Sequence, residues 1–166
     1  MDLIRTLQLI RTGIDLFMRF ICFFTGSVMA VTLLLQVIFR YFLGSSLSWA
    51  TELPEMLFPW LAMSGATIAA LSKKHLGVDY FVSKLSLRHR TWLLALTNLI
   101  TIVALTTIAI VSFRMLSLLG QQATPVLGVA RSYAFFSLPL GLICLAMVVA
   151  SDTLLAFAEQ TPSNAK

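Results

Sequence analysis

Four long runs without a charged residue set the strongest limit on how this chain can fold. Each run lies between charged residues and is mostly apolar: residues 20–39, 56–72, 91–113 and 132–151. A helix that crosses the hydrocarbon core of a bilayer needs about 17–25 mostly apolar residues. We therefore predict four transmembrane helices, over about residues 20–39, 53–72, 91–113 and 132–151, with the second one extended to place Glu55 at the interface.

The composition agrees with a membrane protein. The chain is 58% hydrophobic and 11% charged, with a mean hydropathy of +0.90, whereas soluble domains are about 45–50% apolar and about 25% charged. Lipid cannot hydrogen-bond the backbone, so segments in the bilayer form helices or closed barrels. A barrel would need alternating strands of about ten residues, and these runs are continuous instead. We predict an all-α integral membrane protein with one membrane domain, residues 1–166.

Residues 1–19 differ from the four runs because charges interrupt them. Read as a helix, they place an apolar face opposite a polar one that carries Arg5, Gln8, Thr12, Asp15 and Arg19. This pattern predicts an amphipathic helix that lies in the membrane interface and leads into the first span. The same charges leave no uninterrupted apolar stretch of the kind found in a cleavable signal peptide.

Lysine and arginine are distributed unequally between the two sides of such a protein. Four spans leave only Arg40, Arg114 and Arg131 on one side, and the other nine of the 12 basic residues on the side of the termini. The positive-inside rule places the richer side in the cytoplasm. We predict that both termini are cytoplasmic. Because the basic residues border apolar segments and form no stripe, the net charge of +5 does not indicate nucleic-acid binding.

Small and polar residues mark faces where these helices could pack. In the second span Ala62, Ala66 and Ala70 recur at every fourth position, with Gly65 beside them, and such ridges let helices approach closely in lipid. Polar residues also occur within spans, and we expect them to face protein and to hydrogen-bond between helices: Thr25, Thr32, Gln36, Asn98 and Thr101.

The chemistry of an enzyme or of an independent carrier is missing from the four runs. No ionisable residue lies at mid-membrane depth, where it would indicate an ion or proton pathway. No histidine lies in a run. We expect Cys22 and Cys144 to be small residues that pack in the interior. We predict no catalytic, metal-binding or substrate-binding residue and no cofactor. The alternative is a small four-helix carrier of the multidrug-exporter type, which needs a carboxylate in its first helix, and residues 20–39 contain none.

Several residues near the ends of the spans could contact a partner protein. On the outer side, Glu52 is a candidate ion-pair partner for Arg40, while Trp49 and Trp60 are either anchors for a partner or members of an aromatic belt. On the inner side, His75 and Asp79 are spaced i, i+4. They are either a contact site for a partner or a local pair that caps the end of the second span.

The order of these residues resembles a known family. The motifs are Arg40-Tyr41, Trp49, Glu52-Leu53, Leu57, Trp60, Gly65-Ala66, His75 and Asp79, followed by Thr124-Pro125, Leu127-Gly128 and Leu138-Pro139-Leu140-Gly141. Together they resemble the small membrane subunit, of the dicarboxylate-carrier Q type, of tripartite ATP-independent periplasmic (TRAP) transporters. The resemblance covers roughly residues 14–155.

The resemblance implies a role in a three-part importer of the bacterial inner membrane. A periplasmic binding protein would capture an organic acid, such as a C4-dicarboxylate or sialic acid, and a large many-helix subunit would carry it inward with a sodium gradient. The small subunit would scaffold the large one among the membrane lipids and help to dock the binding protein. The residues that we expect at partner interfaces are Arg40, Trp49, Glu52, Trp60, Gly65, Ala66, His75 and Asp79.

Overall fold

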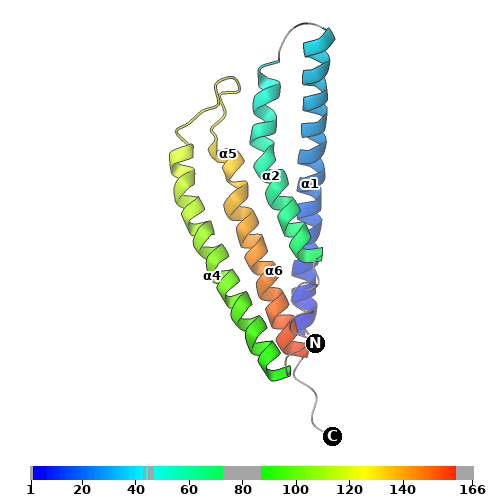
Figure 1. Ribbon diagram of the computed structural model, residues 1–166, viewed down its shortest axis with the longest axis vertical. Coiled ribbons are helices and arrows are strands. Elements are labelled where there is room, and N and C mark those ends of the chain that lie inside the picture. Colours follow the sequence, from blue (N-terminus) through cyan, green and yellow to red (C-terminus); the bar gives the residue numbers. More distant parts are fainter. Residues whose placement is uncertain (1, 43, 45–46, 73–86, 160–166) are drawn as a thin grey trace.

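The structure, a computed structural model, describes residues 2–42, 44, 47–72 and 87–159. This part of the chain is helical and holds no β-strand, only an isolated bridge between Ala123 and Ala130. The predicted all-α class is therefore confirmed. The helices, labelled in Figure 1, are α1 (Asp2–Phe42), α2 (Trp49–Ser72), α4 (Leu87–Leu119), α5 (Ser132–Phe135) and α6 (Ser137–Glu159).

Three stretches of the described helices are long and apolar enough to cross a membrane. They are Arg5–Phe42, Leu96–Leu119 and Ser132–Leu154, and each contains 18 consecutive residues with a mean hydropathy of 2.2. Helix α2 is not among them, because two glutamates, two prolines, two tryptophans and several serine and threonine residues lower its mean hydropathy. Three of the four predicted spans are thus supported by length and composition, and the second span stays a prediction.

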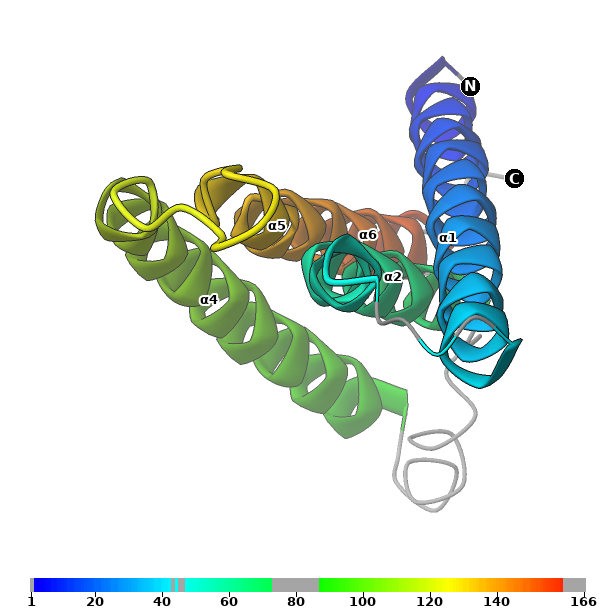
Figure 2. The same ribbon diagram turned by 90° about the horizontal axis from the view of Figure 1, so that it is seen from above.

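The helices form an open row rather than a closed bundle. Helix α1 packs on α2, α2 packs on α6, and α6 packs on α4. The view from above in Figure 2 accordingly shows α2 and α6 between the outer helices α1 and α4. The chain therefore consists of two helical hairpins, α1–α2 and α4–α6, joined side by side through their second members. Among the described residues, each outer helix keeps a long exposed apolar face, which on α1 includes Phe23, 77% exposed.

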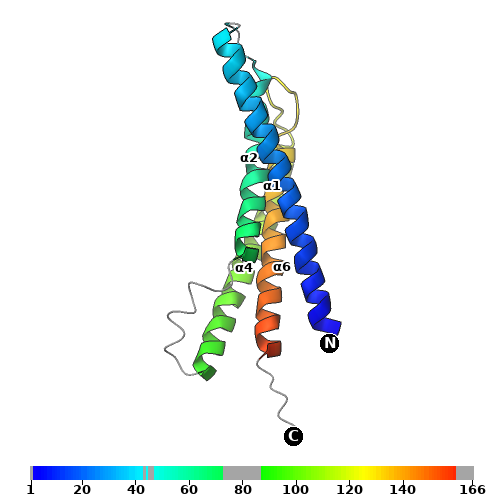
Figure 3. The same cartoon turned by 90° about the vertical axis from the view of Figure 1, so that its right-hand side faces the viewer.

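Helix α1 runs without interruption through the boundary that we predicted near residue 19 (Figure 3). The interfacial segment and the first span are one helix, since neither proline nor a backbone irregularity separates them and an Arg19–Asp15 ion pair of 2.8 Å bridges one turn there. Its 41 residues would extend about 62 Å, twice the bilayer core of about 30 Å. Part of α1 must therefore lie outside the core, and the interfacial placement of residues 1–19 stays a prediction.

Small hydroxyl residues form much of the buried interior. Ser64 and Thr67 are at most 1% exposed, and Thr25 and Thr32 at most 5%. The latter two therefore face protein, as expected, but their predicted bonds between helices are wrong: each hydroxyl donates to a carbonyl one turn earlier in its own helix. This local bond satisfies the hydroxyl without requiring a partner at a fixed position across the interface.

Two contacts do join the helices closely. The amide of Asn98 on α4 donates to the hydroxyl of Thr153 on α6 at 2.9 Å, which is the kind of bond that the sequence suggested. At Gly141 on α6 the packing is tightest, because an added Cβ atom would lie 2.8 Å from the Cβ atom of Met63 on α2. Only glycine fits there without movement of the neighbouring helix, and this glycine fixes how closely the two hairpins approach.

Candidate partner interface

Glu52, at the start of α2, binds the turn that connects α4 to α5. Its two carboxylate oxygens accept hydrogen bonds from the backbone N–H groups of Val126 and Leu127, both at 2.9 Å. The predicted ion pair with Arg40 is wrong. The described residues form other ion pairs, and the Glu52 carboxylate is occupied by the turn instead. The reason lies in the tertiary structure, which folds residues 120–131 over the first turn of α2.

The turn has a defined backbone that points these two N–H groups the same way. Thr124 and Val129 face each other across it. The N–H of Thr124 donates to the carbonyl of Val129 at 2.9 Å, and the N–H of Val129 donates to the Thr124 hydroxyl at 3.2 Å. Gly128 closes the turn with a positive φ of 64° and donates to the carbonyl of Thr124 at 3.1 Å. Successive N–H groups in such a turn form a concave site for an anion, and Glu52 supplies that anion.

The surroundings of Glu52 favour its charged form. Partial desolvation, the largest single influence, raises the pKa of the carboxyl group, but the hydrogen bonds from Leu127 and Val126 outweigh it. A hydrogen bond with Thr124 and the positive charge of Arg131 act in the same direction, so the pKa lies below its usual value. Stability that depends on this carboxylate is present above the ordinary pKa of a glutamate and is lost as the pH falls through the lowered one. Near neutral pH the contact is intact.

The two tryptophans occupy different positions. Trp60 is partly exposed, and its indole N–H donates to the carbonyl of Tyr133 at 3.1 Å, which links α2 to α5. Trp49 lies at the first position of α2 and is 38% exposed. Trp60 is therefore a contact within the chain, whether or not it also belongs to an aromatic belt, and Trp49 stays available to a partner. Arg40, on the last turn of α1, is also exposed.

The predicted ridge of small residues lies on the outer surface of α2. Ala62 and Ala66 are exposed, and a Cβ atom added to Gly65 would meet nothing within 4 Å. The opposite face of the same helix carries the buried residues Ser64 and Thr67. The ridge therefore does not pack on any other helix that the structure describes, and its surface is open to a further helix.

A second polar contact joins the hairpins at the opposite end from Glu52. Arg11 on α1 forms an ion pair with Asp152 on α6, and both side chains are partly buried. We did not predict this pair, although Asp152 borders the last apolar run, Arg11 lies in the charged segment before the first one, and the predicted topology places both on one side. The inner-side candidates His75 and Asp79 lie outside the described residues.

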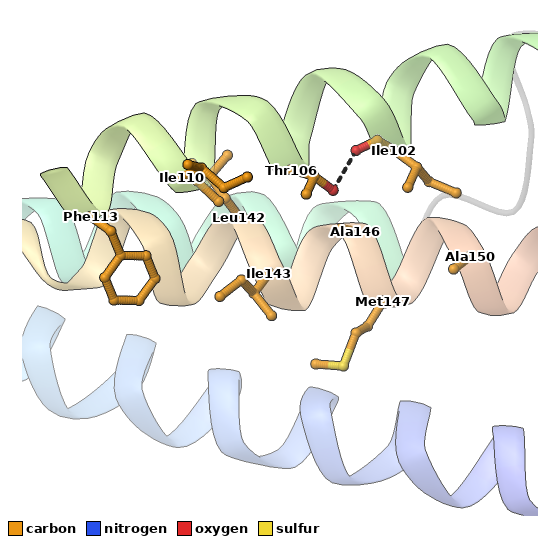
Figure 4. Close-up of a pocket in the computed structure, with 10 residues that line it drawn as sticks. Ile102, Thr106, Ile110, Phe113, Leu142, Ile143, Ala146, Met147 and Ala150 are labelled. Atoms are coloured by element: carbon orange, nitrogen blue, oxygen red, sulfur yellow. Dashed lines mark hydrogen bonds between the residues drawn. The ribbon is translucent and has the colours of Figure 1, made fainter.

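An apolar groove of about 400 Å³ lies between α4 and α6. Figure 4 shows the side chains that line it, among them Phe113 and Ile110 from α4 and Ile143 and Met147 from α6. Its lining contains no ionisable group, and the hydroxyl of Thr106 is bonded to the carbonyl of Ile102 at 2.7 Å. The groove therefore suits hydrocarbon rather than an organic acid or a cation. Within the described residues, no three His, Cys, Asp or Glu side chains are placed to hold a metal ion.

Comparison with known proteins identifies relatives of this chain. Residues 29–159 match the family described as tripartite ATP-independent periplasmic transporters, DctQ component. The chain is 30% identical, over 142 residues, to an uncharacterised protein of Sinorhizobium fredii; the match covers 85% of this chain but only 26% of that protein. It is 25% identical, over 120 residues, to a protein of Haemophilus influenzae named as a TRAP transporter small permease, covering 72% of this chain and 74% of that one.

Proposed function

The chain belongs to the DctQ-component family of TRAP transporters, and from this we propose that it is the accessory small membrane subunit of a binding-protein-dependent importer. In this role it scaffolds a large many-helix subunit and helps to dock a periplasmic binding protein. We propose that the large subunit holds the sodium and substrate sites and that the substrate is an organic acid. Family membership does not favour the alternative of a self-contained multidrug exporter.

The observation that carries the scaffold role is the way the two hairpins are fastened together. Glu52 ties them at one end, the Arg11–Asp152 pair ties them at the other, and the close contact at Gly141 lies between. A row of helices fastened at three levels resists bending and sliding, whereas a carrier must change shape during each cycle. At the same time both outer helices leave apolar faces open for a neighbour in the membrane.

We propose that the chain crosses the bacterial inner membrane four times, with α2 as the second span. Although α2 is not among the three candidate spans, it packs between α1 and α6, so part of its surface is shielded from lipid. This topology predicts that reporter fusions after Ser86 and after Asn164 are cytoplasmic and that a fusion after Gln122 is periplasmic. Paired alkaline phosphatase and fluorescent protein fusions measure this. A periplasmic signal at Ser86 would exclude the arrangement.

We expect Ala66→Leu to weaken the complex with the large subunit and to leave this chain intact. The substitution adds bulk to the exposed ridge, where overpacking against an external helix costs about 1–3 kcal/mol. Thr67→Leu is the matched control, because Thr67 is 0% exposed and faces the interior; it should lower the thermal stability of the isolated subunit. Co-purification and thermal unfolding in detergent measure the two effects. If Ala66→Leu does not reduce co-purification, the ridge faces lipid, and if the wild type does not co-purify, the proposed function fails.

A further inference from the structure

The turn that Glu52 holds carries apolar side chains on its outer surface. Val126 is 52% exposed, and Leu127 and Val129 are each 36% exposed. These three residues, here called the apolar turn, lie within four positions of one another. Single exposed apolar residues are common on proteins, but three together in a turn with a fixed backbone form a contact patch.

The apolar turn lies outside the helices that cross the membrane. The candidate spans Leu96–Leu119 and Ser132–Leu154 end and begin on either side of it, so the intervening residues emerge from the lipid on one side. In the proposed topology this side is the periplasm. A water-soluble protein can reach the turn from there, and the binding protein is the water-soluble component of the proposed importer on that side.

The charge beside the apolar turn is positive. Arg131 is exposed and close enough to Glu52 to lower the pKa of its carboxyl group. The Glu52 carboxylate, however, has both oxygens engaged by backbone donors. The surface that a partner meets is therefore an apolar projection beside a guanidinium group, which complements an apolar recess with a carboxylate on its rim.

We propose that Glu52 is a positioning residue, which holds the apolar turn in the shape that docks the periplasmic binding protein. This proposal rests on the proposed function of the chain. The physical reason is preorganisation: a turn that is already fixed loses less conformational entropy when a partner binds. Without the carboxylate, the N–H groups of Val126 and Leu127 would bond to water, and docking would first have to fix the position of the turn against α2.

The test compares Glu52→Gln with the wild type in the full complex with the large subunit, in lipid nanodiscs. A glutamine has a single acceptor oxygen, so at most one of the two backbone bonds survives. We expect the amides of Val126 and Leu127 to exchange hydrogen about tenfold faster and the binding protein of the same transporter to bind about tenfold more weakly. In uptake assays the KM for the loaded binding protein should rise by the same factor with Vmax unchanged.

Two further variants separate positioning from a general loss of structure. Glu55→Gln removes an exposed carboxylate one turn later on α2 and should change neither exchange nor docking. Leu127→Ser keeps the backbone N–H groups but removes part of the apolar turn, so it should weaken docking while exchange stays at the wild-type rate. An equal melting temperature for all four complexes shows that the fold is unchanged.

Faster exchange in Glu52→Gln with unchanged docking would overturn the proposal, because the carboxylate would then only stabilise the turn. Unchanged exchange would overturn it as well. If Glu52→Gln melts at a lower temperature, Glu52→Asp decides between the two roles: its shorter side chain keeps the charge but cannot reach both N–H groups, so docking should still weaken. A wild-type complex that does not bind the binding protein at all would contradict the proposed function itself.

Discussion

Liposomes that contain this chain alone should accumulate no organic acid under a sodium or a proton gradient. A gradient-driven carrier needs a site at mid-membrane depth where an ion or substrate binds, formed by ionisable residues or by interrupted helices. The groove between α4 and α6 is apolar and has no ionisable lining residue, and α1 is continuous throughout its length. The chain therefore offers no such site among its described residues.

Adding the large subunit and a loaded binding protein should produce uptake that depends on an inward sodium gradient. Dissipating that gradient should abolish uptake, and ATP should have no effect. Radiolabelled substrate inside the liposomes measures the difference, with liposomes that contain the large subunit and binding protein but lack this chain as the control. Accumulation by this chain alone would refute the accessory role. Full uptake in the control would leave the family membership standing and show that the chain is dispensable.

Gly141→Leu should be the most destabilising single substitution in the contact between the hairpins. Any side chain at this position would begin 2.8 Å from the Cβ atom and 2.7 Å from the Cε atom of Met63. The Cε atom can move aside, but the Cβ atom is fixed to the backbone of α2, so the helices must separate. We expect a loss of about 2–3 kcal/mol, the upper part of the range typical of overpacking, measured by thermal unfolding of the purified subunit.

The matched control is Gly65→Leu, where the added side chain meets open space and should leave the isolated subunit unaffected. A second variant tests the cause. Met63→Ala removes the outer atoms of the methionine but keeps its Cβ atom, so it should rescue Gly141→Leu only in part. Equal stability of Gly141→Leu and Gly65→Leu would mean that α2 and α6 do not meet closely at Gly141.

The family and the helical class could be predicted because they depend on features that are local in the chain. Runs of apolar residues between charges identify membrane helices, since the bilayer requires internally bonded backbone and a minimum length. The helices extend beyond the predicted spans: α4 runs from Leu87 to Leu119, past both ends of 91–113, and α2 begins at Trp49, before residue 53. Charges mark where lipid ends, and a helix continues past that point wherever its backbone bonds are satisfied.

The sequence by itself determined that this is a helical membrane protein and which polar residues lie near the ends of its spans. It did not determine which helices lie on the outside of the row. Only the tertiary structure decided which of those residues meet. Glu52 binds backbone N–H groups more than 70 residues away, and backbone donors have no signature in the sequence. Arg11 and Asp152 are 141 residues apart, so their pairing depends on the N-terminal part of α1 lying beside the C-terminal part of α6. Side-chain type limits the bonds a residue can form, and packing selects among them.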